Sequence, residues 1–304
     1  MLEAIFLLGF GKSFLNRKKA EMVNDNSQEF IIHLDTDGPA GKNRITAHYN
    51  NRFSLFLDQK KSTIFEIKRY LYPVYFSSSD YNLYIENKPY TRKMVDRFVF
   101  GVDTLYLRYL LSYNKALKQK NFLLKTKRNI NELKSWNKIL SEMAEKLVGI
   151  KMSFIKQLNV EIEKKFGTQL KFLYKPSFNL EEGISHTVFL QQIEAMEEKE
   201  MILRRGMIGT HLDKYSMELN SKPLSLYSSG EKKIHLLMIY IAFIELYKNI
   251  HSRYPIFLVD DFDTAIDSHN IDFLVKNYPS MQVIATSVNL HDAFDNTIQL
   301  KKEN

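Results

Sequence analysis

The chain has 304 residues, of which 44% are hydrophobic and 26% are charged, the balance of a soluble globular protein with room for one large or two ordinary domains. Its 43 Lys and Arg against 35 Asp and Glu give a net charge of +8, which suits a polyanionic partner such as nucleic acid, or reflects only a lysine-rich solvated surface. The absence of cysteine excludes disulfides and thiolate metal sites, and no stretch approaches about 18 consecutive apolar residues, so no membrane span is expected.

The N-terminal segment, residues 1 to about 15, predicts a helix that begins without an N-cap. It includes Gly11-Lys12-Ser13, which looks like the end of a phosphate-binding loop. A Walker A loop needs Gly-x-x-x-x-Gly-Lys-Ser/Thr directly after a strand, whereas Phe6 stands where the first glycine should be. We therefore expect no phosphate loop here. The apolar face of the predicted helix comprises Leu2, Ile5, Phe6, Leu8 and Gly9.

Alternating apolar and polar residues then predict antiparallel strands. They cover residues 30–35, 44–49 and 52–58, with turn signals at 37–39 and 50–51. A further short strand is expected at 73–76, followed by the polar run 77–80.

Residues 91 to about 166 predict charged helices. An apolar stripe of Leu107, Leu110, Leu111 and Leu117 is expected to pack inward. Cations on or near the exposed faces would contact the phosphate backbone of DNA without reading its sequence, although a solvated helical face is an equally common reason for such a row. The cations are Lys115, Lys118, Lys120, Lys125, Lys127 and Arg128.

The next part of the chain mixes helices and strands. The charged helices end at Gly167, and strands are expected at 170–174 and 215–219, with an acidic run at 194–200 between them. His211 precedes the second of these strands, and we expect a hydrogen-bonded structural histidine rather than a ligand contact.

Ser228-Ser229-Gly230 opens a long apolar helix. Exposed backbone N–H groups and two hydroxyls at a helix start form an anion-binding corner, and the same residues also make an ordinary N-cap.

Residues 255–259 form an apolar run that predicts a strand covered on both faces, as in a parallel sheet. Asp260 and Asp261 follow it, at the sheet edge where open α/β folds bind ligands. Two buried carboxylates need a counter-charge, so Mg²⁺ or a basic partner is expected, unless the pair merely caps the strand. A last apolar strand at 281–285 ends in Thr286-Ser287.

In this order, the motifs resemble the signature, Walker B and D-loop series of the ABC-type ATPases, in particular the RecF branch of the SMC-like DNA repair ATPases. The matching stretches are YSSGEKK and IFLVDDFDTAID, and the resemblance covers nearly the whole chain, most strongly at 2–14, 92–125 and 224–287. Glu231 stands where that family usually has Gln.

The resemblance implies roles for individual residues. Asp260 would bind Mg²⁺, and Asp261 would polarise the attacking water. The γ-phosphate of an ATP held by the opposite subunit would be contacted by Ser228, Ser229 and Gly230. Asp267 would belong to the D-loop that spans the dimer, and Ser287 would be the switch residue at the γ-phosphate.

The resemblance also implies an α/β fold, an ABC-type P-loop NTPase head of the SMC/RecF kind with flanking antiparallel strands and a helical second lobe. Residues 1–90 and 206–304 would form the head and residues 91–205 the lobe. In that alignment Leu2 to Phe14 matches the helix directly after Walker A, so the phosphate loop would lie upstream, through a late start codon or a true truncation. The 304-residue chain is then expected to hydrolyse ATP little or not at all.

The implied function is a cytoplasmic DNA-binding ATPase of recombinational repair, DNA damage response and replication restart. It would use ATP and Mg²⁺, form an ATP-dependent homodimer on single-stranded or gapped DNA, and help mediator proteins load recombinase. Two alternatives remain open: a truncated, non-hydrolysing partner subunit, and a RecF-like ATPase of a phage-defence or mobile-element system.

Overall fold

The computed structural model describes residues 1–38, 41–77, 79–126, 130–261, 277–288 and 294–298. The chain packs into two compact units, one formed by residues 1–81 with 247–304 and the other by residues 82–246. The division into 1–90, 91–205 and 206–304 that the family implies stays a prediction.

The first unit contains an antiparallel sheet of four strands in sequence order. Its strands are β1 (Glu29–Gly38), β2 (Gly41–Asn50), β3 (Arg52–Leu57) and β4 (Lys60–Ser62). Left-handed backbone at Asn51, Asp58 and Gln59 makes the tight turns between the later strands. The three predicted strands are confirmed, whereas β4 is too short to show an alternating pattern and was not predicted.

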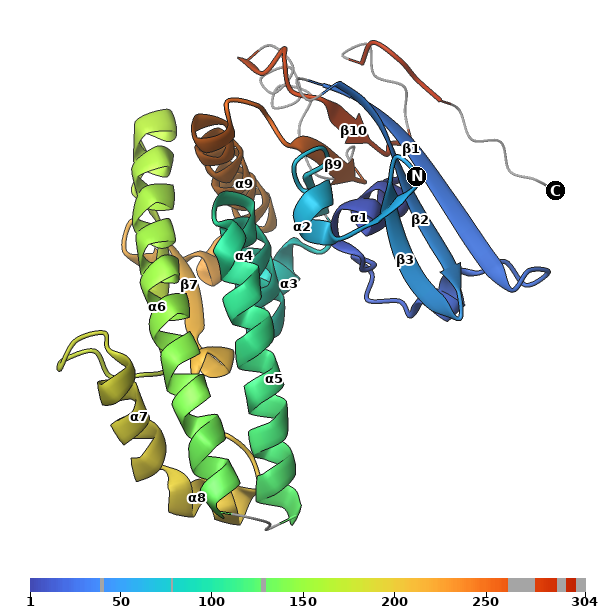
Figure 1. Ribbon diagram of the computed structural model, residues 1–304. Coiled ribbons are helices and arrows are strands. Elements are labelled where there is room, and N and C mark those ends of the chain that lie inside the picture. The colour runs from blue at the N-terminus through green and yellow to red at the C-terminus, as the bar shows by residue number, and fades with distance from the viewer. Residues whose placement is uncertain (39–40, 78, 127–129, 262–276, 289–293, 299–304) are drawn as a thin grey trace. The chain divides into compact units, whose positions relative to one another are not determined.

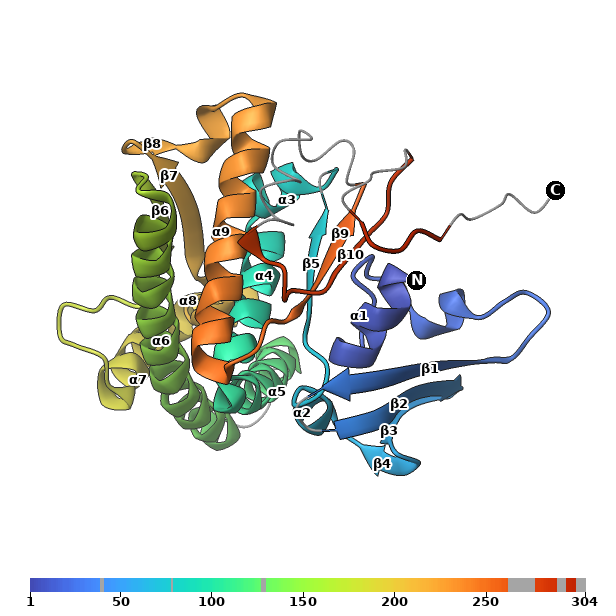
Figure 2. The ribbon, with the colours of Figure 1, turned by 90° about the horizontal axis from the view of Figure 1, so that it is seen from above.

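A parallel sheet of three strands forms the second layer of this unit. The strand β9 (Ile256–Asp260) lies between β5 (Pro73–Ser77) and β10 (Val283–Ala285), as Figure 2 shows. Phe257, Leu258 and Val259 are fully buried. The prediction of a strand covered on both faces, as in a parallel sheet, is confirmed. Its central position in the sheet was not predicted.

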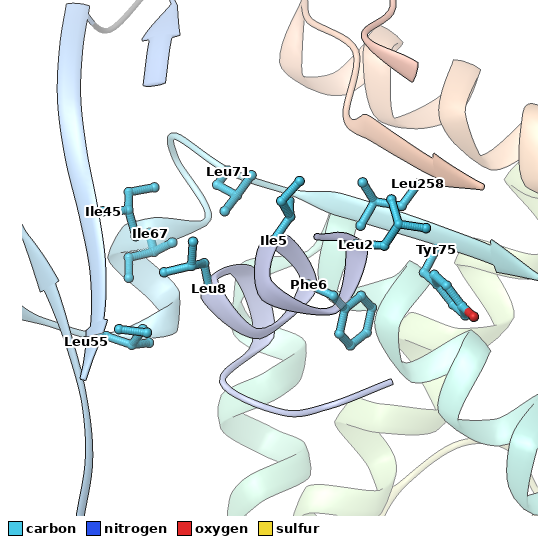
Figure 3. Packing of buried hydrophobic residues seen from close by; sticks show 11 residues of the cluster. Leu2, Ile5, Phe6, Leu8, Ile45, Leu55, Ile67, Leu71, Tyr75 and Leu258 are labelled. Atoms are coloured by element: carbon cyan, nitrogen blue, oxygen red, sulfur yellow. The ribbon is translucent and has the colours of Figure 1, made fainter. Parts of the chain in front are cut away.

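The helix α1 (Leu2–Phe10) joins the two sheets through one apolar core. Four of its side chains meet those of the antiparallel sheet on one side and of the parallel sheet on the other (Figure 3): Leu2, Ile5, Phe6 and Leu8. Gly9 lets the helix approach Pro73, the first residue of β5, because a Cβ at Gly9 would overlap the proline ring. The short helices η1 (Lys19–Met22) and α2 (Ile64–Ile67) follow in the same unit.

Gly11 ends α1 in the left-handed conformation, with φ 63°. Its N–H donates to the carbonyl of Leu7 at 2.7 Å, and the Ser13 hydroxyl donates to the carboxylate of Glu3. The segment Gly11-Lys12-Ser13 is thus a helix C-cap, and the prediction that it is no phosphate loop is confirmed.

The second unit is built on long helices beside a small antiparallel sheet. The helices α5 (Thr104–Thr126) and α6 (Ile130–Phe166) lie side by side (Figure 1). The sheet comprises β6 (Leu170–Lys175), β7 (Lys214–Leu219) and β8 (Lys222–Pro223) in that order. The other elements are α3 (Tyr81–Glu86), α4 (Lys88–Val102), α7 (His186–Ala195), α8 (Glu197–Leu203), η2 (Thr210–Leu212), η3 (Leu224–Leu226) and α9 (Ser229–His251), which runs on into the first unit.

Helical spacing of apolar residues explains these elements. Along α6, buried side chains recur at helical spacing, so that each has another three or four positions away: Leu140, Ala144, Leu147, Val148, Lys151, Phe154, Ile155, Leu158 and Ile162. None of the helices described combines the length and low charge content needed to cross a bilayer.

Asp213 is the centre of a buried polar network in this unit. Its carboxylate accepts hydrogen bonds from Lys151 Nζ at 2.9 Å, from the Tyr174 hydroxyl at 2.8 Å and from the Ser177 N–H at 2.9 Å. Because Asp213 and Lys151 are almost completely shielded from solvent, each needs the other, and removing one partner would leave an uncompensated buried charge.

His211 lies two residues before Asp213 and has a structural role. Its Nδ1 accepts the Tyr113 hydroxyl at 2.8 Å, and Nε2 faces the Gly206 carbonyl at 3.5 Å. Burial lowers the pKa of His211 to about 4, although the Gly206 carbonyl and the charge of Asp213 act in the opposite direction. The histidine is therefore neutral at physiological pH, and the sequence-based interpretation is confirmed.

We expect Gly9→Ala to destabilise the chain by about 1–3 kcal/mol, because the added methyl must push α1 away from Pro73. Urea unfolding measures the change. Gly149→Ala on α6 is the matched control: nothing lies within 4 Å of its added Cβ, so the helix should gain up to about 1 kcal/mol. Equal stability of the Gly9→Ala variant and the wild type would contradict the close approach of α1 and β5.

Lowering the pH from 7 to 5 should destabilise the chain through His211. The unfolded histidine takes up its proton near the ordinary pKa of 6.5 and the folded one near 4. Between pH 7 and 5 the unfolded state therefore binds more protons, and the free energy of unfolding decreases as the pH is lowered. The loss is at most about 2 kcal/mol. Urea titrations at both pH values should show that His211→Gln loses less stability between pH 7 and 5 than the wild type does. The same loss in both proteins would rule out His211 as its source.

Candidate functional site

The carboxylate of Asp260 is held at the carboxyl end of β9 by the strands on either side. Thr286, directly after β10, donates its hydroxyl to Asp260 Oδ1 at 2.6 Å. Tyr75 of β5 donates its hydroxyl to Oδ2 at 3.1 Å. Each carboxylate oxygen accepts one of these neutral hydrogen bonds and keeps a further lone pair for a cation.

Asp261 follows in the left-handed conformation, with φ 52°, which is uncommon for a residue other than glycine. The change of backbone direction ends the strand and leaves Asp261 exposed. Its N–H donates to the Thr286 hydroxyl at 3.1 Å, so Thr286 contacts both aspartates and fixes one relative to the other.

Asp80 adds a third negative group at this edge. Burial raises the pKa of Asp80, and the charges of Asp260 and Asp261 raise it further. An edge with oxygen ligands and excess negative charge fits Mg²⁺ better than a soft metal. Among the residues described, no three His, Cys, Asp or Glu side chains are grouped to hold a metal by themselves, and Mg²⁺ commonly completes its shell with water and phosphate oxygens.

Asp80 and Thr286 were missed as site residues by reasoning from sequence. Both follow predicted strands, and the carboxyl ends of parallel strands meet at one edge of the sheet. That geometric rule is the signal that could have found them. Ser287, the predicted switch residue, follows Thr286 and is exposed, and Asp267 lies outside the described residues.

Ser228 caps the N-terminus of α9 together with Glu231. The Ser228 N–H and hydroxyl donate to Glu231 Oε2 at 3.0 and 2.6 Å, and the Glu231 N–H donates back to Ser228 Oγ at 3.4 Å. This reciprocal pattern is a capping box. The Ser228 hydrogen bonds lower the pKa of Glu231, so a carboxylate stands in the first turn.

Ser229 and Gly230 lie in that same turn and are exposed. A Cβ at Gly230 would meet nothing within 4 Å, so the helix start is open to an incoming group. The geometry of this helix start is therefore compatible with both interpretations of the sequence, an ordinary N-cap and an anion-binding corner.

The cations predicted for DNA contact divide into three groups. Lys115, Lys118 and Lys125 are exposed and follow one face of α5. Leu111 and Phe122, 51% and 54% exposed, lie on that face as well. The prediction that Leu111 packs inward is thus wrong, because the buried face of α5 runs through Tyr113, Ala116, Lys120 and Leu123.

Lys120 was predicted to lie on or near an exposed face, and this is wrong. It occupies the buried stripe, one turn after Ala116, and is 1% exposed. Its Nζ pairs with Glu200 Oε2 of α8 at 2.6 Å, and burial lowers the pKa of Lys120 despite this partner. The acidic run at 194–200 supplies the counter-charge. Lys127 and Arg128 lie outside the described residues.

Comparisons with known proteins point in one direction. No family model matches the chain. The DNA replication and repair protein RecF of Acetivibrio thermocellus is 28% identical over 305 residues, which cover 94% of this chain and 82% of that protein. The RecF protein of Ruminiclostridium cellulolyticum is 28% identical over 313 residues, covering 95% of this chain and 83% of that protein.

Two solved structures share the fold. The recombination mediator protein RecF-ATPrS in the RecFOR pathway has a TM-score of 0.85 at 20% identity and covers 97% of this chain and 84% of that one. The RecF-ATP structure has a TM-score of 0.82 at 22% identity, covering 94% of this chain and 83% of that one. The predicted fold class, an α/β head of the RecF kind with antiparallel strands and a helical lobe, is confirmed. The chain is similar to RecF proteins along almost its whole length.

Proposed function

We propose that the chain is an ATP-dependent DNA-binding protein of the RecF kind that acts in DNA replication and repair. The observation that carries this proposal is the edge formed by Asp260, Asp261 and Thr286 at the end of a buried parallel strand. It is supported by relatives named RecF along almost the whole chain and by a RecF fold solved with ATP.

In this mechanism the chain's own residues hold the metal ion and orient the groups around it. Asp260 would hold Mg²⁺, which supplies charge neutralisation at the phosphates when bound. Thr286 and Tyr75 keep the Asp260 carboxylate in one orientation. Asp261, exposed and fixed through its N–H, polarises the attacking water. Positioning of this kind supplies most of the catalysis in phosphoryl transfer.

The start of α9 serves as the signature face. Ser228, Ser229 and Gly230 would contact the γ-phosphate of ATP in the opposite subunit, and first-turn N–H groups favour such an anion. Glu231 opposes this contact, because its carboxylate already accepts the Ser228 hydroxyl. Ser287 would approach the same phosphate. Loss of the γ-phosphate on hydrolysis removes the contact and opens the dimer.

A dimer of this kind would help mediator proteins load recombinase at gapped DNA.

We expect Asp261→Asn to trap ATP-bound dimers in a form of the chain fused behind the phosphate-loop segment of a RecF relative. The amide can no longer polarise water, while ATP still joins the subunits. Light scattering in ATP and in ADP measures dimerisation, and phosphate release measures turnover. Adding Ser228→Arg to the same variant is the control and should abolish the dimer. Unchanged turnover in Asp261→Asn refutes the role of Asp261, and comparable turnover by the unfused chain refutes the need for the loop.

We expect replacement of Lys115, Lys118 and Lys125 by Gln to weaken duplex DNA binding at least about tenfold at low salt. Each lost phosphate contact should also reduce the slope of log K against log salt by about 0.9. Fluorescence anisotropy over a salt series, with duplex and gapped oligonucleotides, measures both quantities.

The control variant replaces Lys134, Lys138 and Lys156 of α6, which are exposed as well. It removes the same charge from the same unit and should bind DNA nearly as the wild type does. Equal losses in the two variants would mean that net charge, and not the α5 face, attracts DNA.

A further inference from the structure

A cationic pocket of about 540 Å³ lies within the unit formed by residues 82–246. Lys88 and Arg92 reach it from the first turns of α4, Lys175 from the end of β6, and Lys214 from the start of β7. The residues that line it include four cations and no carboxylate. We call it the α4–β7 pocket. None of its four cations was assigned a role above.

The three lysines of this pocket lack counter-charges. In the part of the chain that the structure describes, Lys88, Lys175 and Lys214 have no carboxylate within ion-pair distance. Arg92 donates from Nη1 to the backbone carbonyl of Asp213 at 3.2 Å, which fixes the guanidinium, and its charge acts on the buried carboxyl of Asp96.

The nearby carboxylates are committed elsewhere. Asp213 accepts from Lys151, Tyr174 and Ser177. Asp96, one turn after Arg92 on α4, accepts the Tyr106 hydroxyl at 2.6 Å. Neither Asp213 nor Asp96 is among the residues that line the pocket.

A second, independent observation points to a ligand. Lys175 and Lys214 are direct partners across the antiparallel pair of β6 and β7. Like charges in directly opposite positions destabilise a sheet, so the fold keeps an unfavourable pair of lysines in the lining of this pocket. An anion between the two ammonium groups would turn that repulsion into attraction.

The walls of the pocket are held in place. Pro89 stands in the first turn of α4 and Pro176 directly after β6, and each fixes its backbone φ. Ser177 donates its N–H to Asp213 at 2.9 Å and accepts the Gly209 N–H at 3.2 Å. A ligand would therefore meet cations whose supporting backbone is already ordered, which lowers the entropic cost of binding.

The lining chemistry selects phosphate. It contains no aromatic ring, so no base can stack there, and Leu212, 38% exposed, is a poor anchor for a peptide side chain. Lysines act as point charges for phosphate, and a guanidinium adds a donor fork. We propose that the α4–β7 pocket is a phosphate-binding site, filled by the phosphodiester backbone of nucleic acid or by a free polyphosphate. Only its use by DNA rests on the function proposed above.

The test compares two double variants of the whole chain. Lys175→Gln with Lys214→Gln removes two pocket cations. Lys171→Gln with Lys222→Gln removes two exposed lysines of the same sheet that lie outside the pocket. Urea unfolding midpoints are measured with increasing pyrophosphate at constant ionic strength. Pyrophosphate should raise the midpoint of the wild type and of the control, and leave the pocket variant unchanged.

A third variant, Lys214→Glu, separates a loss of phosphate binding from a loss of folding. It places opposite charges across the β6–β7 pair, so the variant should be at least as stable as the wild type in the absence of phosphate. It should also lose the response to pyrophosphate. A stable variant that no longer responds cannot be explained by misfolding.

Binding of labelled DNA, ATP and polyglutamate to the same variants identifies the source of the anion. A loss of about tenfold or more for DNA in the pocket variant alone assigns the phosphodiester backbone, and a loss for ATP or pyrophosphate with DNA unchanged assigns a free polyphosphate. Equal pyrophosphate responses in the pocket and control variants overturn the proposal, as does a pocket-specific loss confined to polyglutamate. If the α5 lysine variant binds DNA as the wild type does, the pyrophosphate experiment still tests the pocket by itself.

Discussion

The burial of β9 is the constraint on which the first unit depends. Phe257, Leu258 and Val259 are fully buried, and shielding each such side chain contributes about 1.5–3 kcal/mol. A strand that is apolar on both faces needs cover on both faces, and its buried N–H and C=O groups need hydrogen-bond partners on both edges. This places β5 and β10 beside it in parallel. Tyr75 and Thr286 consequently reach Asp260 from opposite sides, although 185 and 26 residues separate them from it in sequence.

The second unit depends on buried charge as much as on apolar packing. Lys120 with Glu200, and Lys151 with Asp213, connect α5 to α8 and α6 to the start of β7. Such pairs add little net stability over apolar residues of similar size, but removing one partner is costly. They therefore fix which surfaces of the helices face one another. The exposed cations of α5 and the α4–β7 pocket lie on the surfaces that this arrangement leaves open.

Glu231 shows how one local change alters a site without altering the fold. A capping box stabilises the start of α9 whether or not a nucleotide is present. The same carboxylate also accepts the Ser228 hydroxyl and brings a negative charge to the turn that is proposed to contact the phosphate. Helix stability and anion affinity therefore oppose each other at this residue, which explains why a neutral Gln suits a phosphate contact better.

The sequence by itself determined the order and type of the long elements, the cover of β9 on both faces and the cap at Ser228, because these depend on periodicity and on residues close together in the chain. Motifs in a fixed order also indicated the resemblance to RecF proteins. Only the tertiary structure decided that Lys120 is buried against Glu200, that Thr286 and Asp80 join Asp260, and that four cations share the α4–β7 pocket. Those outcomes depend on which faces meet across distant segments, and charge alone does not show whether a lysine faces solvent or a buried partner.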